Sequence, residues 1–269
     1  MRRSTFAAVD LAEATAVLNR IFEEYLLPLE FSQVQMEVHL EANQIDRSLS
    51  PIWYADDGTL LAAGTLAVRE ERGWIGGFGV APPHRRRGIA GALLESIVQG
   101  ARLRALRSIA LEVLVDNTGA IRTYERGGFS VRRTLESSRL RPTRHSAASG
   151  RLISVAPLLE RRDPVAPCWQ RETVSLRSQP AICGVALAED AFAIFRHNRN
   201  EAQILKIEAQ CSDHVAALAS SIAEAFELEA VSLFNEPAES AIAGYVRELG
   251  WERTFEQYEM AATLVPGTC

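Results

Sequence analysis

The stretch from Trp74 to Leu94, WIGGFGVAPPHRRRGIAGALL, decides the fold. It opens with the residues of a strand, turns at Pro82-Pro83, and continues from Ile89 with apolar residues at helical spacing. Three arginines and a glycine, Arg85 to Gly88, therefore lie between the end of a strand and the start of a helix. The first amides of a helix have no partner within it, so this turn predicts a site for an anion.

Two familiar nucleotide-binding patterns fail at this turn. Pro82 stands where a dinucleotide fingerprint beginning at Gly77 needs its third glycine. Lys206 is the only lysine of the chain, which excludes a phosphate loop of the GxxxxGK type. An anion would be held instead by guanidinium groups and by backbone amides that small residues leave accessible. The basic start of an ordinary surface helix is the alternative.

Hydrophobic periodicity around this stretch predicts two helices, a run of three strands, and then further helices and strands. Helices are expected at 12–25, 31–42, 89–101 and 118–126, and strands at 52–54, 60–68, 74–80, 109–115, 129–134 and 137–140. This arrangement indicates an α/β (α+β) fold.

A second motif follows the first. It reads Asn117-x-x-Ala120-x-x-x-Tyr124-Glu-x-x-Gly128-Phe129. Together with Arg85-x-x-Gly88-x-Ala90 after an apolar strand, it resembles the GCN5-related N-acetyltransferase (GNAT) family over residues 5–141. The resemblance implies a mixed, mostly antiparallel twisted sheet flanked by helices. It also implies transfer of the acetyl group of acetyl-CoA, as co-substrate, to a primary amine.

The resemblance assigns the parts of a cofactor site. The first motif would hold the pyrophosphate of acetyl-CoA, and the end of the preceding strand would pair with its pantetheine arm. The pyrophosphate-binding residues would be Arg85, Arg86, Arg87, Gly88, Ile89, Ala90 and Gly91, and the arm-binding residues Phe78, Gly79 and Val80. Backbone chemistry agrees, because a strand whose neighbour diverges leaves peptide groups that an extended amide ligand can pair with. The Val80 amide would then polarise the thioester carbonyl.

Two side chains of the second motif are candidates for the chemistry. Asn117 either bonds the cofactor arm or caps the following helix. Tyr124 matches the tyrosine that many GNAT enzymes are thought to use to protonate the leaving thiolate. A phenol with a pKa near 10 is protonated at neutral pH and can act in this way. An aromatic ring packed between helix and sheet is the alternative for Tyr124.

The general base stays open at this point, because no carboxylate lies in 74–80. The candidates are Glu112, Glu23, Glu24 and Tyr25, each of which is more simply a solvated helix residue or a satisfied polar group. The histidines show no metal-ligand spacing, and we expect no metal. All four cysteines lie in the second half of the chain, so we expect direct transfer in a ternary complex rather than an acyl-thiol intermediate.

The second half of the chain weakly repeats the first. The run Val113–Asn117, the tyrosine at 124 and Gly128-Phe129 have counterparts in Val231–Asn235, Tyr245 and Gly250-Trp251, about 120 residues later. The stretch from Pro142 to Gly150 is small and polar, as connectors are. We therefore expect a GNAT acetyltransferase domain at 1–141, a linker at 142–151 and a second GNAT-like domain at 152–269.

The second domain is predicted to have lost coenzyme binding. Its strand at 204–209 is followed directly by Cys211-Ser-Asp213 and a helix, with no arginine-rich turn. Ser212 or Asp213 would cap that helix, and a carboxylate there would occupy the amides that a phosphate needs.

Composition sets the remaining limits. The 269 residues are 47% hydrophobic and 23% charged, which is typical of a globular protein. Acidic residues interrupt the apolar N-terminal region, so a soluble, cytoplasmic protein is expected. A net charge of −5 gives no general attraction for nucleic acid or acidic membranes. We expect a monomer or homodimer that acetylates a small-molecule or protein amine. The alternative function is a non-catalytic acyl-CoA-binding sensor or interaction scaffold.

Overall fold

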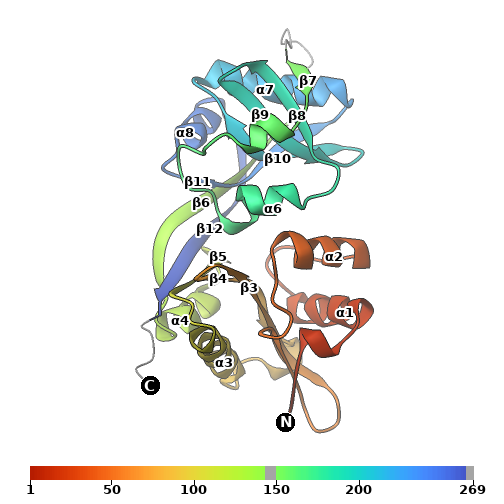
Figure 1. The fold of residues 1–269 in the computed structure, drawn as a ribbon, viewed down its shortest axis with the longest axis vertical. Helices are drawn as coiled ribbons and strands as arrows, with labels where there is room; N and C mark the ends of the chain where they lie inside the picture. Colours follow the sequence, from red (N-terminus) through yellow and green to blue (C-terminus); the bar gives the residue numbers. More distant parts are fainter. Residues whose placement is uncertain (143–149, 265–269) are drawn as a thin grey trace. The chain divides into compact units, whose positions relative to one another are not determined.

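A computed structural model describes residues 1–142 and 150–264 and divides the chain into two compact units (Figure 1). The first comprises Met1–Arg132 with Tyr258–Cys269, and the second comprises Arg133–Gln257. The first unit thus takes residues from both ends of the chain, and the second unit lies between them in the sequence. Strand β6 (Ser130–Leu140) leads into the second unit, and the end of β12 (Glu252–Thr263) belongs to the first. Of the linker expected at 142–151, residues 143–149 lie outside the described residues.

The first unit has the strand order β1-β2-β3-β4-β5-β12. Its other elements are β1 (Arg2–Thr5), α1 (Leu11–Phe22), α2 (Gln33–Ala42), β2 (Pro51–Tyr54), β3 (Leu60–Arg69), β4 (Arg72–Val80), α3 (Ile89–Leu103), β5 (Ser108–Leu114) and α4 (Thr118–Arg126). Pairing from β1 to β4 is antiparallel, and β4 pairs with β5 in parallel. This mixed, mostly antiparallel sheet confirms the predicted fold class.

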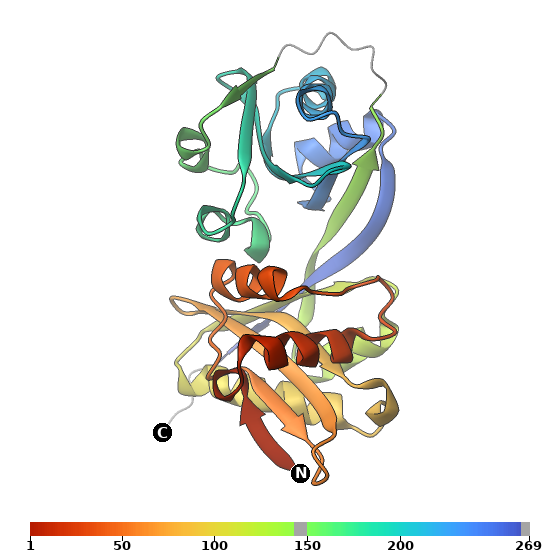
Figure 2. The same cartoon turned by 90° about the vertical axis from the view of Figure 1, so that its right-hand side faces the viewer.

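Helices cover both faces of this sheet, with α1 and α2 on one side and α3 and α4 on the other (Figures 1 and 2). Each helix start has a local cause. Asp10 caps α1 by accepting from the Glu13 amide at 2.8 Å, and Ser32 forms a capping box with Gln35 at the start of α2. The apolar face of α3, centred on Leu93 and Ile97, is fully buried in the core.

A β-bulge in β4 decides which side chains face which helices. Ile75 pairs with Leu66 and Gly77 pairs with Thr65, so Gly76 is an extra residue. The alternation of faces therefore reverses at Gly76. Before the bulge Ile75 lies in the core under α3, and after it Phe78 packs there instead. A side chain at Gly79 would lie 3.1 Å from Ile21 of α1, so the strand passes this helix closely.

The second unit repeats the element order of the first. Its strands lie in the order β12-β6-β11-β10-β9-β8-β7. The remaining elements are β7 (Arg151–Ile153), α5 (Ala156–Leu159), α6 (Thr173–Arg177), β8 (Cys183–Ala188), β9 (Ala191–His197), β10 (Glu201–Glu208), α7 (Ser212–Ala225), β11 (Ala230–Pro237) and α8 (Ala241–Glu248). The same succession of strands and helices, from β1 to β6 and again from β7 to β12, confirms the tandem arrangement.

Three local expectations differ from the structure. The strands expected at 129–134 and 137–140 are one strand, β6, because it has paired neighbours on both sides, β12 and β11. The N-cap of α7 is Cys211 and not Ser212 or Asp213, and no side chain caps this helix. Strand β1 was not expected, because Arg2–Thr5 has no apolar alternation. Among the described residues, no helix combines the length and the apolar character that a membrane span requires.

Candidate active site

The parallel strands β4 and β5 diverge, and we call the resulting opening the β4/β5 splay. Their pairing covers Arg72–Ile75 and Ser108–Leu111, while β4 continues to Val80. The Ala81 amide donates to the Leu61 carbonyl of β3 at 2.9 Å. Because successive amides along a strand point to opposite sides, the Val80 amide points away from β3 and into the splay. Residues 78–80 therefore form one wall of the opening, as an arm-binding strand requires.

The turn between β4 and α3 is open toward solvent at its glycines. Gly88 is the N-cap of α3 with φ of 79°, and it leaves the first helical amides without a side-chain cap. A Cβ atom at Gly88 or at Gly91 would meet nothing within 4 Å. The side chains of Arg86 and Arg87 are exposed. The amides of residues 89–91 are consequently accessible to an anion, with two guanidinium groups next to them in the chain.

Arg85 has a different environment from its two neighbours. Its Nε donates to the Val80 carbonyl at 3.1 Å, and its Nη2 donates to the Glu23 carbonyl at 2.7 Å. Its Nη1 lies 3.4 Å from the Glu24 carboxylate. Arg85 therefore joins the end of β4 to the segment that follows α1.

Asn117 caps α4, which is one of the two roles that the sequence left open. Its Oδ1 accepts from the Ala120 amide at 3.2 Å. Its side chain also hydrogen-bonds the hydroxyl of Tyr25, and this bond opposes the effect of burial, which raises the Tyr25 pKa. The segment after α1 is thus tied to the end of β5 as well.

Tyr124 is a packed aromatic residue at the wall of the splay. Its ring is 5.6 Å from Phe78 and 6.0 Å from Phe129, between ring centroids, and only 5% of its surface is exposed. Burial raises the pKa of Tyr124, and the neighbouring Tyr25 raises it further. Its hydroxyl makes no hydrogen bond to any of the described residues. The phenol is therefore protonated over the physiological pH range and retains a donor.

The base candidates occupy separate places. Glu23 and Glu24 are exposed at the end of α1 and form ion pairs with Arg20 and Arg85. Glu112 directly follows the last β5 residue that pairs with β4, and it accepts from Trp74 Nε1 at 2.7 Å. Trp74 lies 6.3 Å from the ring of His39 on α2. Glu112 therefore lies at the base of the splay on the α2 side, whereas Tyr124 lies on the α3 and α4 side.

The structure brings together Tyr25, Asn117 and Tyr124, which no sequence pattern connects. The sequence predicts Tyr25 as the last residue of a helix at 12–25 and as one of several base candidates, whereas α1 ends at Phe22 and Tyr25 lies in the connection after it. Within residues 1–142 and 150–264, no group of histidine, cysteine and acidic side chains is arranged to hold a metal ion.

The second unit has a splay at the equivalent place, between β10 and β11. Pairing covers Glu201–Ile204 and Ala230–Leu233, and Leu205 is the extra residue of a bulge in β10. The guanidinium of Arg171 lies between the strands. Its Nε donates to the Leu205 carbonyl at 2.7 Å and its Nη1 donates to the Asn235 carbonyl at 3.0 Å.

Arg171 is paired as well as hydrogen-bonded. It forms an ion pair of 2.6 Å with Glu236, and the two side chains are 5% and 9% exposed. Tyr245 is the equivalent of Tyr124 in this unit. Its hydroxyl already has a partner within the unit, because it donates to the Gln210 carbonyl at 2.8 Å. Three residues, 209–211, connect β10 with α7, and they include no arginine and no glycine. The second unit therefore keeps the fold and lacks a counterpart of the turn Arg85–Gly91, which we call the phosphate turn after the ligand predicted for it.

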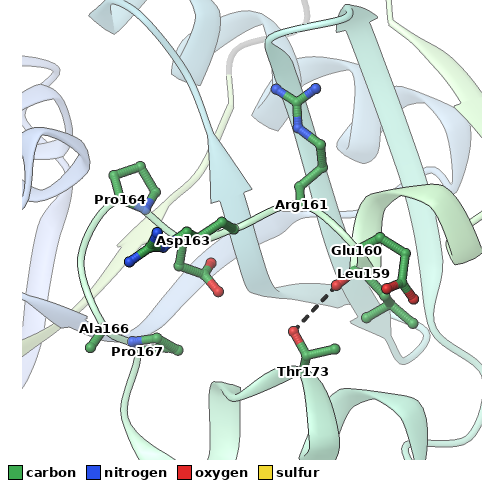
Figure 3. A pocket seen from close by; sticks show the side chains of 9 residues that line it. Leu159, Glu160, Arg161, Asp163, Pro164, Ala166, Pro167 and Thr173 are labelled. Carbon is green, nitrogen blue, oxygen red and sulfur yellow. Dashed lines mark hydrogen bonds between the residues drawn. The ribbon is translucent and has the colours of Figure 1, made fainter.

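A pocket of about 490 Å³ lies in the second unit beside the segment that leads to Arg171 (Figure 3). Its walls are polar and their charges are largely neutralised, since Asp163 binds Lys206 Nζ at 3.1 Å and Arg161 binds Glu208 at 2.9 Å. Thr173 donates to the Leu159 carbonyl across it, at 3.3 Å. None of the predicted site residues lines this pocket.

Comparison with known proteins agrees with this geometry. A profile of the acetyltransferase (GNAT) family matches residues 16–129. No curated protein matches the sequence. The family match lies within the first unit, and the fold of the two units is similar to that of a tandem GNAT protein.

Three solved structures share the fold over nearly the whole chain. A tandem GNAT protein from the clavulanic acid biosynthesis pathway has 14% identity and a TM-score of 0.67, with 99% of both chains covered. A GCN5-related N-acetyltransferase from Sphaerobacter thermophilus has 14% identity and a TM-score of 0.71, covering 99% of this chain and 96% of that one. A putative acetyltransferase from Pyrococcus horikoshii has 12% identity and a TM-score of 0.66, with coverage of 98% and 89%.

Proposed function

We propose that the first unit binds acetyl-CoA and transfers its acetyl group directly to a primary amine. The observation that carries this proposal is the junction of an open β4/β5 splay with an uncapped helix start at Gly88. An extended amide ligand fits the first, and a pyrophosphate fits the second. The pyrophosphate would contact residues 85–91, and the arm would follow residues 78–80. We place the reaction in the cytoplasm, where the donor is available.

The transfer step follows from the residues around the splay. The amine nitrogen attacks the thioester carbon, and the Val80 amide donates to the oxygen that becomes negative. The carbon–sulfur bond then breaks, and the thiolate accepts a proton through Tyr124. The amine must also lose a proton. Glu112 at the base of the splay is our candidate for receiving it.

One observation favours a second candidate function. Burial raises the pKa of Tyr124 and makes the phenol a weaker acid. A protein that binds acyl-CoA without turnover, as a sensor or scaffold, has no need of a strong acid. A screen of small-molecule and peptide amines separates the two functions, because only the enzyme releases free CoA in proportion to acetylated amine.

Calorimetric titration with acetyl-CoA tests the proposal. We expect one site per chain, because the second unit lacks the phosphate turn and Arg171 fills its splay. Gly88→Glu places bulk and negative charge at the start of α3 and should weaken binding by about 100-fold, which corresponds to about 2.7 kcal/mol. Gly58→Glu is the matched control, because Gly58 also has a positive φ, 87°, and open space around it. Two sites per chain, or equal effects of both substitutions, would contradict the assignment.

A further inference from the structure

The segment Glu23–Tyr25 connects the ends of the two strands that form the splay. At one end Arg85 donates to both the Val80 and the Glu23 carbonyls. At the other end Tyr25 is hydrogen-bonded to Asn117, whose amide in turn donates to the carbonyl of Leu114, the last residue of β5. We call this segment the bridge. The bridge thus meets both strand ends beyond the point where they diverge.

The bridge holds Tyr25 in a defined position. The Tyr25 amide donates to the Phe22 carbonyl at 2.9 Å, and the two rings are in edge contact with centroids 5.4 Å apart. Glu24 adopts a left-handed conformation with φ of 60°, which makes the turn tight. Beyond the bridge the chain is fixed again, because the Phe31 backbone exchanges two hydrogen bonds with the Asn19 side chain, at 2.8 and 3.0 Å.

Aromatic rings surround the part of the splay where the proposed thioester lies. Phe78 precedes Val80 on β4 and is in contact with Tyr124 of α4. Tyr25 lies close enough to Tyr124 to raise the pKa of its hydroxyl. Two of these rings, Phe78 and Tyr124, are packed into the core of the first unit. The ring of Tyr25 is half-buried, and this residue lies in the connection between α1 and α2.

We propose that Tyr25 sets the upper limit to the length of the acyl group, so that the protein takes an acetyl donor and rejects longer acyl chains. The inference rests on the proposed function, because it places the acyl carbon beyond the Val80 amide. A longer chain in that direction reaches the phenol of Tyr25. It enters only if the ring moves, which breaks the contact with Phe22 and the hydrogen bond with Asn117.

Binding of a series of acyl-CoA donors tests this proposal without knowledge of the amine. Acetyl-, butyryl- and octanoyl-CoA are titrated calorimetrically into the full chain and three variants. The wild type should bind acetyl-CoA at least about tenfold more tightly than butyryl-CoA, the range of discrimination that a hydrophobic pocket achieves per one or two methylenes. Tyr25→Ala should remove that difference by tightening butyryl-CoA binding, with acetyl-CoA affinity changed less than about threefold.

Two further variants make the result specific. Tyr25→Phe keeps the ring and loses the hydroxyl, so it should retain the preference for acetyl-CoA. Tyr245→Ala removes the equivalent tyrosine of the second unit and should leave the preference unchanged. Tyr25→Leu, of intermediate size, replaces the alanine variant if that variant does not fold by circular dichroism. Equal affinities for all three donors in the wild type, or an unchanged preference in both smaller variants, would overturn the proposal. Failure of every donor to bind the wild type would overturn the proposed function itself.

Discussion

In the first unit β4 and β5 part beside a turn of arginines and glycines, whereas in the second unit β10 and β11 part around the side chain of Arg171. Both splays begin after four paired residues, and both have a bulge in the first strand of the pair. The backbone geometry is therefore common to the two units. They differ in the partners of the backbone N–H and C=O groups that no longer pair once the two strands diverge.

Diverging strands must satisfy these peptide groups with some other partner. In the second unit the chain supplies the partner itself, since one guanidinium donates to carbonyls of both strands. In the first unit Arg85 donates to the Val80 carbonyl, whereas the Val80 amide faces the β4/β5 splay. We propose that Arg171 takes, in the second unit, the place of the ligand that the first unit is predicted to bind.

The largest expected effect concerns Arg171. Arg171→Met leaves the carboxylate of Glu236 buried without its cation, which costs about 3–5 kcal/mol in comparable buried pairs. We expect the second unit to lose stability by this amount, while acetyl-CoA affinity stays that of the wild type. Urea denaturation gives the free energy of unfolding, and amide exchange of peptides spanning 205–207 and 235–237 locates the loss.

The control is Arg177→Met, which removes an arginine of the same unit from an exposed ion pair with Glu160. Exposed pairs contribute less than about 1 kcal/mol, so the control should stay close to the wild type. If both variants lost the same stability, the splay of the second unit would not depend on Arg171.

Acid should affect the first unit selectively, through His39. The ring is partly exposed, but its Nε2 is enclosed and has no partner among the described residues. Burial lowers the pKa of His39 to about 4 from 6.5. Between these values the unfolded chain binds one proton more than the folded one, so stability rises with pH across this window. The contribution, about 3 kcal/mol, is complete above pH 6.5 and is lost as the pH falls toward 4.

Thermal or urea unfolding at several pH values measures this slope. His39→Gln should flatten the pH dependence between 4 and 6.5, because no imidazole then has to stay neutral. The matched change in the second unit is His214→Gln, at an imidazole that accepts a long bond of 3.4 Å from the Gln210 amide. An unchanged slope in the first variant would assign the acid sensitivity to other groups.

Local features of both units were predictable from the sequence, and contacts between distant residues were not. The start of α3 at Ile89 and the full extent of α4 follow from helical spacing and from the glycines beside them. The phosphate turn is likewise a contiguous stretch. In contrast, the contacts of Tyr25 with Asn117 and of Arg171 with Asn235 join residues far apart in the chain, which local patterns do not connect.

The assignment of the end of β12 to the first unit was not predicted, for a related reason. Periodicity divides the residues of β6 into two short strands, and it does not identify a strand's neighbours. The expected boundary at 141 fell at the polar stretch in the chain, whereas the compact units divide within β6 and within β12.

The two equivalent tyrosines allow the sharpest comparison of the units by activity. Tyr124→Phe removes the hydroxyl beside the proposed thiolate and keeps the ring between Phe78 and Phe129. We expect kcat to fall by about 100-fold, the lower range for loss of a general acid. The KM for acetyl-CoA should change little, because this hydroxyl makes no bond to the described residues of the free protein. Steady-state rates with an amine from the screen measure both quantities.

Tyr245→Phe is the counterpart in the second unit, where the hydroxyl donates to the Gln210 carbonyl. That bond is exposed, so its loss should cost no more than about 1 kcal/mol of stability and leave the transfer rate unaltered. Wild-type kcat in the Tyr124 variant would remove the phenol from the mechanism and leave proton transfer to water. A fall in kcat of similar size in both variants would mean that the second unit takes part in the chemistry, and the contrast between an open and an internally filled splay would no longer separate their functions.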